Sequence, residues 1–240
     1  MSNCHSHGPQ DFRHESLLMA PYRIRKYRES DREWVVDLFS EGVAEYAPIT
    51  FRHILKLPRT LVLLFGGPLA VLLASGSWLL ALATNLTLLV LLRLFAKYPW
   101  NEFKVLVLQS DMSDITKFYL CDHGSCFWVA ESEEQVVGMV GALPVNDPTL
   151  WKQKLQLLHL FVDSGHRRRG IAKALVRTVL QFAQDRGYRE VVLCTSMLQH
   201  SALALYRSMG FQKTGGEFFS LSWRLVAVPT FFLVYRLPVI

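Results

Sequence analysis

Three consecutive arginines, residues 167–169, stand directly before Gly170, where an apolar strand-like run gives way to the pattern of an amphipathic helix. Between Phe161 and Glu190 there are seven Lys or Arg and three Asp or Glu residues, so seven minus three leaves a net charge of +4. A turn from a strand into a helix presents unpaired backbone N–H groups and the positive end of the helix dipole. The segment therefore predicts an anion site, and a pyrophosphate matches its charge. A solvated turn without a ligand is the alternative.

This turn differs from two common phosphate-binding motifs. It matches neither the nucleoside-triphosphate loop G-x-x-x-x-G-K-[ST] nor the dinucleotide fingerprint G-x-G-x-x-G. The whole chain has a formal net charge of +6, which is concentrated at the turn rather than spread over a surface of basic and aromatic residues. The sequence therefore argues against nucleic-acid binding.

The elements around the turn alternate between strand and helix patterns. Apolar runs predict strands at 22–27, 126–132, 136–145, 154–163 and 190–195, with an acidic turn at 131–135, and we expect the final apolar runs to be strands as well. Helical periodicity predicts helices at 32–46, 113–120, 169–186 and 200–211. The fold class is therefore α/β, a central sheet flanked by helices.

A long uncharged run interrupts this domain. Residues 60–92 form 33 positions without a charge, bounded by Arg59 and Arg93. One straight helix of that length would measure about 50 Å, which exceeds a hydrocarbon core of about 30 Å. A break at 75–77 divides the run into two arms, and the basic residues on both flanks favour a cytosolic position for both. The run predicts a membrane-embedded helical hairpin; a buried soluble hairpin is the alternative.

The chain divides into four parts: a polar tail at 1–18, the first strand and helix at 19–56, the membrane insert at 57–98, and the main part of the α/β domain at 99–240. The tail lacks an apolar core, so we do not expect a signal peptide. The cysteines show no C-x-x-C spacing, which favours reduced thiols in a domain that faces the cytosol. Cys4, His5 and His7 are interpreted as a chance cluster, and no metal is expected.

Two motifs indicate a family. Arg167-x-x-Gly170-x-Ala172, after the strand "LHLFV", resembles the acetyl-coenzyme A motif of the Gcn5-related N-acetyltransferases, and "ALALYRSMGF" resembles the later helix with that superfamily's tyrosine. Within the superfamily, "MAPYRIRKYRESD", the early insert, "CFWVAESEE" and "GIAKALVRTVLQFA" resemble the camello group, which includes membrane-bound cysteine S-conjugate N-acetyltransferases of the endoplasmic reticulum. The resemblance covers 22–56 and about 100–236. The family turn usually has glycine where Arg168 stands.

The resemblance implies a mixed central sheet and a reaction in which an amine attacks acetyl-coenzyme A directly. It implies that backbone N–H groups at Leu160, Phe161 and Val162 bind the pantetheine and the thioester carbonyl. It also implies that the turn formed by Arg167, Arg168, Arg169, Gly170, Ile171 and Ala172 binds the pyrophosphate. Tyr206 would hydrogen-bond or protonate the departing thiolate; a core tyrosine is the alternative.

His159 is the candidate general base. Imidazole exchanges protons near neutral pH, and the residue lies near the expected position of the acetyl group. The two-residue period of a strand predicts that His159 shares a face with Leu155, Leu157 and Phe161. A core histidine is the alternative, and Glu131 or a chain of waters is an alternative base.

Three functions fit these features. The first is an N-acetyltransferase at the endoplasmic reticulum membrane or the Golgi, facing the cytosol, that acetylates the α-amino group of S-substituted cysteines to mercapturic acids. The second acetylates lysines of secretory-pathway proteins, and the third is a non-catalytic module, because the camello group is also associated with cell adhesion and gastrulation.

The expected partners are a small amine, membrane lipid and, for the second function, protein lysines. For a cysteine conjugate, the insert flanks with Phe218, Phe219 and Trp223 would receive the apolar group, whereas no unique arginine is indicated for the carboxylate.

Overall fold

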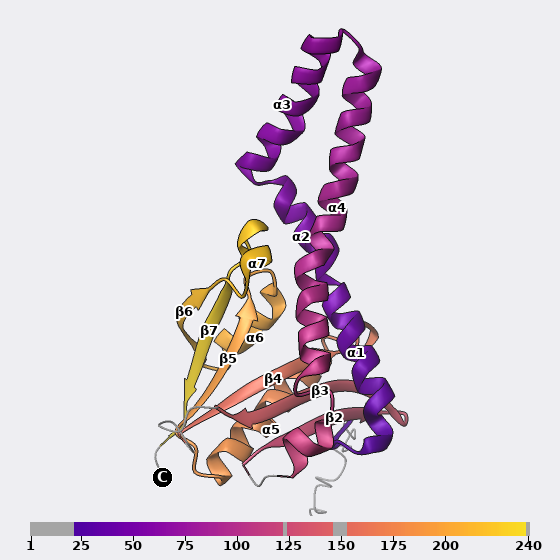
Figure 1. The fold of residues 1–240 in the computed structure, drawn as a ribbon. Helices are drawn as coiled ribbons and strands as arrows, with labels where there is room; N and C mark the ends of the chain where they lie inside the picture. The colour runs from indigo at the N-terminus through magenta and orange to yellow at the C-terminus, as the bar shows by residue number, and fades with distance from the viewer. Residues whose placement is uncertain (1–21, 122–123, 146–152, 239–240) are drawn as a thin grey trace, which may run out of the picture.

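The computed structural model describes residues 22–121, 124–145 and 153–238, and within them a mixed seven-stranded sheet forms the centre of the molecule (Figure 1). The polar tail, with its Cys-His cluster, lies outside the described residues. The strands are β1 (Arg23–Lys26), β2 (Cys126–Ser132), β3 (Gln135–Pro144), β4 (Lys154–Val162), β5 (Glu190–Ser196), β6 (Gln212–Glu217) and β7 (Thr230–Arg236). Their order is β1-β2-β3-β4-β5-β7-β6, and β4 and β5 run parallel whereas the other neighbours are antiparallel. The predicted α/β class and mixed sheet are confirmed.

Two helices cover the two faces of the sheet. The apolar residues of α1 (Arg32–Ala44) and of α5 (Ile171–Asp185) recur at intervals of three and four, so each helix buries one stripe. Trp128 and Ala130 of β2 belong to the core beneath α5, and Phe127 and Val129 belong to the core beneath α1. The period of two along β2 thus assigns its side chains to the two faces.

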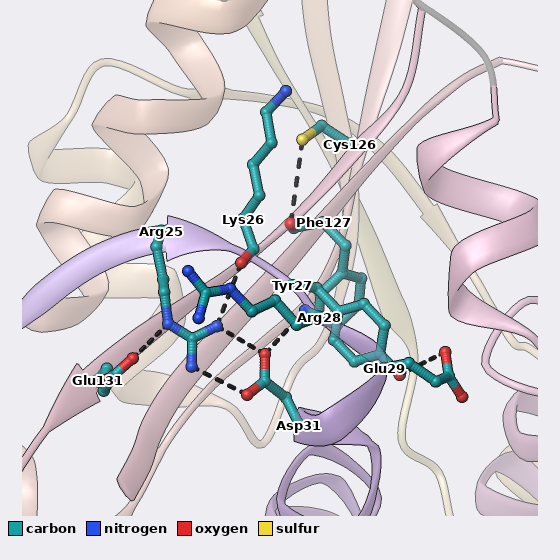
Figure 2. A network of polar contacts seen from close by, with 9 residues as sticks. All are labelled: Arg25, Lys26, Tyr27, Arg28, Glu29, Asp31, Cys126, Phe127 and Glu131. Atoms are coloured by element: carbon teal, nitrogen blue, oxygen red, sulfur yellow. Dashed lines mark hydrogen bonds and ion pairs between the residues drawn. The ribbon is translucent and has the colours of Figure 1, made fainter. Parts of the chain in front are cut away.

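The first strand is fastened by a charged network (Figure 2). The Arg25 guanidinium donates to both carboxylate oxygens of Asp31, at 2.7 and 2.9 Å, and to the Glu131 carboxylate of β2. Asp31 ends the short 3-10 turn η1 (Glu29–Asp31) and also accepts from the backbone N–H of Arg28 at 2.8 Å. Hydrogen bonds with Asp31 raise the pKa of Arg25 above its usual value, despite partial burial. The network fixes the backbone that leads into α1, and it engages the Glu131 carboxylate in an ion pair with Arg25.

The uncharged run forms a helical hairpin that projects from the domain (Figure 1). α2 (Tyr46–Leu55) leads to α3 (Pro58–Ser75), which ends at Gly76 in the left-handed region with φ 63°, and α4 (Trp78–Gln109) returns. At 1.5 Å per residue α3 is about 27 Å long and α4 about 48 Å. Asn85 Nδ2 donates to the Leu64 carbonyl at 3.2 Å and so links the two arms. The predicted break is confirmed, and both helices are long and apolar enough to cross a membrane.

The return helix does not end where the insert was expected to end. α4 continues without interruption across residue 98 and reaches Gln109. Its last turns pack against α1 and the sheet, with Trp100 and Val107 buried. One helix therefore connects the hairpin directly to the core of the domain.

The C-terminal part contains a helix where only strands were expected. After α6 (His200–Ser208), the apolar stretch that follows β6 folds into the short helix α7 (Leu221–Leu225). The hydroxyls of Ser220 and Ser222 both donate to Glu102 of α4 and hold this helix against the base of the hairpin. The prediction of strands is correct for β7. It is wrong for Leu221–Leu225, because the helix there is held by hydrogen bonds to Glu102, which is far away in the sequence.

Candidate active site

A cleft of about 300 Å³ opens where β4 and β5 part. The two strands pair from Lys154–Glu190 to Gln156–Val192 and then diverge. Beyond Gln156, the edge of β4 that faces β5 has backbone groups without β5 partners. The cleft is closed by α4, α6 and α7, so it lies between the sheet and the base of the hairpin. It is the place where backbone N–H groups of β4 are open to a ligand.

A β-bulge turns His159 to the α1 face of the sheet. The β3–β4 register shifts between Met139–Phe161 and Gly141–Leu158, and His159 has a φ of 52°. The ring of His159 contacts Phe39 and Tyr119, which belong to the core beneath α1. Leu155 and Leu157 belong to the opposite core, so the expectation that they share a face with His159 is wrong.

The bulge brings His159 to a carboxylate that the sequence did not indicate. Nε2 of His159 lies 2.6 Å from Oδ2 of Asp111, just beyond the end of α4. The Tyr119 hydroxyl donates to the same oxygen. A Cβ on Gly141 would lie 2.7 Å from the Tyr119 ring, so the glycine of β3 lets that ring pack closely against the strand. Asp111, His159 and Tyr119 thus form one hydrogen-bonded group, of which Asp111 and His159 line the cleft.

The carboxylate of this group is ionised at neutral pH. Burial by itself raises the pKa of Asp111, but hydrogen bonds from His159, Tyr119 and Ser110 outweigh it and lower the pKa to about 2. An ionised carboxylate only accepts hydrogen bonds, so Nε2 of a neutral His159 carries the proton. The second nitrogen, Nδ1, then has a free lone pair, and no described residue hydrogen-bonds to it. Asp111 and His159 thus have the arrangement of a general base, the imidazole, oriented by a carboxylate.

Tyr206 lies on the other side of the cleft. It is 5% exposed, belongs to the core beneath α5 and lines the cleft from α6. Burial raises the pKa of Tyr206 above its ordinary value, and the neighbouring phenol of Tyr46 adds to the effect. Its hydroxyl is therefore protonated at neutral pH and suited to donate. Tyr46 belongs to α2 and stacks on Trp100 of α4 at 4.8 Å, so the neighbour of Tyr206 is held where α2 and α4 pack together at the base of the hairpin.

The turn between β4 and α5 has the geometry of an anion site. Gly170 precedes α5 with a φ of 81°, and a Cβ built on it would meet only the Tyr22 hydroxyl, at 3.9 Å. The first backbone bond of the helix runs from Ala174 N–H to the Gly170 carbonyl, which leaves the N–H groups of Ile171 and Ala172 without an intrahelical acceptor. A positive helix end and an open backbone thus coincide, and a pyrophosphate fits them.

The three arginines of the turn differ in their contacts. Arg167 pairs with Glu45 at 2.8 Å and donates from Nε to the Val162 carbonyl at 3.1 Å. Arg168 has a φ of 65°, so it takes the conformation that glycine usually supplies at this position of the family turn. Arg168 and Arg169 are exposed. Arg167 therefore braces the turn against α1, while the other two are free to meet an anion.

The remaining expected residues separate into two groups. Leu160, Phe161, Phe219 and Trp223 line the cleft, whereas Val162 and Phe218 do not. Glu131 is bonded to Arg25 and is absent from the cleft wall, so it is removed as an alternative base. Sequence reasoning missed Asp111 and Tyr46. Within 22–121, 124–145 and 153–238, no cluster of His, Cys, Asp and Glu has the geometry of a metal site.

Comparisons with known proteins identify the family. A model of the acetyltransferase (GNAT) family matches residues 92–211, which contain Asp111, His159, the turn and Tyr206. The chain is 66% identical to human N-acetyltransferase 8 over 220 residues, which cover 92% of this chain and 97% of the human protein. The chain belongs to the GNAT family. It is also 59% identical to mouse N-acetyltransferase family 8 member 3, over 91% of this chain and 97% of that protein.

The GNAT fold is seen in solved structures as well. An acetyltransferase of the GNAT family from Staphylococcus aureus superposes with a TM-score of 0.52 at 18% identity, covering 90% of this chain and 99% of that chain. The resemblance to the camello-like N-acetyltransferase 8 group is confirmed. The protein is thus a GNAT N-acetyltransferase with a helical hairpin inserted between its first helix and its second strand.

Proposed function

We propose that this GNAT enzyme transfers the acetyl group of acetyl-coenzyme A to the α-amino group of S-substituted cysteines at the endoplasmic reticulum membrane. The observation that supports it best is the cleft between β4 and β5, which has the Asp111–His159 pair on one wall and Tyr206 on another. The product is a mercapturic acid, and no metal takes part. The fit of the coenzyme rests on the open first turn of α5 and on the unpaired edge of β4.

Each residue has a defined task in this reaction. Acetyl-coenzyme A supplies an activated acetyl thioester. Nδ1 of His159 accepts a proton from the substrate ammonium, and Asp111 holds the ring and stabilises the resulting imidazolium. Backbone N–H groups of β4 at Leu160 and Phe161, which line the cleft, bind the carbonyl oxygen while the new N–C bond forms. As the C–S bond breaks, the Tyr206 hydroxyl donates its proton to the sulfur, and the proton released by the newly acetylated nitrogen returns to the Tyr206 oxygen, so that neither a thiolate nor a phenolate remains buried.

Aromatic rings in the cleft support a substrate with an apolar substituent. Trp100 and Trp223 lie 4.7 Å apart, and the rings of Phe103 and Phe219 lie 5.8 Å apart beside them. This cluster lies between α4 and α7 and offers a pocket for the S-substituent of a cysteine conjugate. Burial of an S-substituent as large as a leucine or phenylalanine side chain contributes about 1.5–3 kcal/mol to the free energy of substrate binding.

The hairpin supports a membrane location. Val62, Phe65 and Leu73 of α3 are 71%, 72% and 78% exposed, and α4 exposes a comparable surface. A soluble protein rarely leaves so large a contiguous apolar surface in water. Arg52, Lys56 and Arg59 precede the apolar arms and Arg93 and Lys97 follow them, which favours cytosolic flanks. The cleft would then lie beside the membrane surface, where apolar conjugates concentrate.

The test uses purified full-length protein in detergent micelles. With acetyl-coenzyme A, S-benzyl-L-cysteine should release coenzyme A faster than free lysine or lysine peptides, and mass spectrometry should find the acetyl group on the α-nitrogen. Faster release with lysine peptides would replace the substrate class by protein lysines. No release with any amine, in protein that binds the coenzyme, would refute the proposed function.

A further inference from the structure

Two indole groups lie side by side in the cleft wall, and their N–H groups differ. Trp100 Nε1 donates to the Thr50 hydroxyl at 2.7 Å, inside the contact between α2 and α4. Trp223 is 3% exposed, and its Nε1 has no hydrogen-bond partner among the described residues. Buried N–H groups are nearly always paired in folded proteins, so an unpaired one in a ligand cleft points to an acceptor supplied by the ligand.

Trp223 is held firmly in this position. Ser220, which precedes α7, and Ser222 within it both donate to Glu102 of α4. The Trp223 ring makes edge contacts with Trp100 at 4.7 Å and with Phe219 at 5.9 Å. Trp223 lines the cleft, and its neighbour Phe219 is 41% exposed and can move to admit an acceptor. A donor whose helix is fixed to α4 is suited to recognition.

The charged groups of the cleft leave a substrate carboxylate dependent on neutral donors. Asp111 is ionised there, and no Lys or Arg of the described chain lines the cleft. The hydroxyls of Thr195 and Thr230 are already committed as donors, to Gln199 Oε1 at 2.7 Å and to the Glu217 carbonyl at 2.8 Å. The ionised Asp111 attracts an ammonium group and repels a carboxylate. A zwitterionic substrate would therefore be oriented, with its ammonium toward His159 and its carboxylate toward another wall.

We infer that the Trp223 indole N–H binds the α-carboxylate of the substrate and thereby selects amino acids over simple amines. This inference rests on the proposed function and assigns the carboxylate subsite, for which the sequence indicated no unique arginine. The indole N–H carries no formal charge. It can therefore bind the substrate carboxylate and release the product carboxylate from a cleft that also contains the ionised Asp111. The N–H of Trp223 determines which amines are acetylated, and the Asp111–His159 pair determines how fast.

The experiment compares S-benzyl-L-cysteine with S-benzylcysteamine, which is identical except that it lacks the carboxylate. Trp223→Phe keeps an aromatic ring and removes the N–H. In full-length protein in detergent, the change should lower kcat/KM for S-benzyl-L-cysteine about tenfold more than kcat/KM for S-benzylcysteamine, mainly through KM, because any loss of packing against the benzyl group is common to both amines. Binding of the product N-acetyl-S-benzyl-L-cysteine, measured by calorimetry, should weaken by a similar factor and does not require turnover.

Trp100→Phe is the matched control, because it removes the neighbouring indole N–H that is already satisfied by Thr50. It should affect both amines equally. An equal loss with both amines in Trp223→Phe, or no loss with either, would overturn the carboxylate subsite while leaving the proposed function intact. Absence of turnover of both amines by the wild type would instead refute the proposed function, and unchanged product binding in Trp223→Phe would separately refute the subsite.

Discussion

Asp111 and His159 are 48 residues apart in the chain and are joined by a 2.6 Å hydrogen bond in the cleft wall. Asp111 follows the end of the hairpin's return helix, and His159 lies on the bulge of the strand that borders the cleft. This hydrogen bond therefore connects the hairpin's return helix to the strand that borders the cleft.

Asp111→Asn should reduce catalysis without weakening coenzyme binding. The amide no longer fixes the proton on Nε2 or stabilises an imidazolium, so kcat should fall at least about 100-fold. The KM for acetyl-coenzyme A should stay within about twofold, because Asp111 is remote in sequence and contact from the α5 turn. Asp37→Asn, an exposed change on α1, is the control and should keep full activity. A normal kcat in Asp111→Asn would remove His159 as the base.

The same carboxylate makes a stability contribution that depends on pH. The folded pKa of Asp111, about 2, lies below its ordinary value of 3.8, so the contribution is complete above about pH 5 and is lost as pH falls from about 4 toward 2. It amounts to about 2 kcal/mol. The difference in unfolding free energy between wild type and Asp111→Asn, measured by denaturant titration, should shrink over that interval. A difference in unfolding free energy that stays constant over that pH interval contradicts an ionised Asp111 in the folded protein.

Tyr206→Phe should lower kcat about tenfold or more and change KM much less, because the hydroxyl acts on the departing sulfur rather than on bound substrate. Burial raises the pKa of Tyr206, so the wild type should show no loss of kcat from phenol ionisation up to about pH 10. Tyr188→Phe is a suitable comparison, since Tyr188 belongs to the same core and donates to the Gly124 carbonyl. Tyr188→Phe should lower the free energy of unfolding and leave kcat unchanged. Equal kcat values in the two variants would argue against Tyr206 as the acid.

Arg168→Gly should stabilise the protein. A non-glycine residue pays about 1–2 kcal/mol for the left-handed conformation, and Arg168 has a φ of 65°. Glycine adopts that conformation freely but gains entropy when unfolded, so the net increase in unfolding free energy should be about 1 kcal/mol. Thermal unfolding of the detergent-solubilised protein measures it. A lower melting temperature would show that the Arg168 side chain makes contacts that outweigh the strain.

Gly170→Glu should weaken acetyl-coenzyme A binding at least tenfold, about 1.4 kcal/mol, because it places a carboxylate beside the open N–H groups of α5. Gly187→Glu provides the control. Gly187 also has a positive φ, 77°, and lies just beyond the other end of α5 with nothing within 4 Å of a built Cβ. Both variants carry the same strain and charge, so calorimetry should find the loss of affinity only in Gly170→Glu. Equal affinities would place the pyrophosphate elsewhere.

The hairpin should hold both of its flanks on the cytosolic side of the endoplasmic reticulum. Protease added to sealed microsomes should then digest the N-terminal segment and the catalytic domain together, and the sequon at Asn85 should stay unglycosylated. Protection of one side alone would indicate a single tilted span, and release by alkaline carbonate would contradict membrane integration. Detergent-permeabilised microsomes control for access.

Local patterns were sufficient for most elements. The spacing of Val35, Leu38 and Phe39 predicts α1, and Gly76 between two apolar arms predicts the turn of the hairpin. The turn at Gly170 was recognisable because a glycine and positive charge coincide at the start of an amphipathic helix. These features depend on neighbours in the sequence, which is why pattern reading finds them.

The errors come from long-range contacts. Period-two counting placed His159 with Leu155 and Leu157, but the extra residue of the bulge moves it to the other face. Asp111 has no distinguishing neighbours, and its role depends on α4 continuing past residue 98 to deliver it to that bulge. The pairing of Arg167 with Glu45, which follows α1, is a long-range contact of the same kind that no local pattern indicates, and phosphate binding by Arg167 stays a prediction.

The continuity of α4 gives the enzyme a lever arm. About 48 Å of helix joins the tip of the hairpin to Asp111, and Pro99, which cannot donate a backbone hydrogen bond, marks the place where the helix bends most easily. With the hairpin in a bilayer as proposed, thinner or thicker lipid changes its tilt, and the far end of the lever then shifts the carboxylate against the imidazole. Turnover in liposomes should accordingly depend on acyl-chain length, whereas coenzyme affinity, set at the turn before α5, should not.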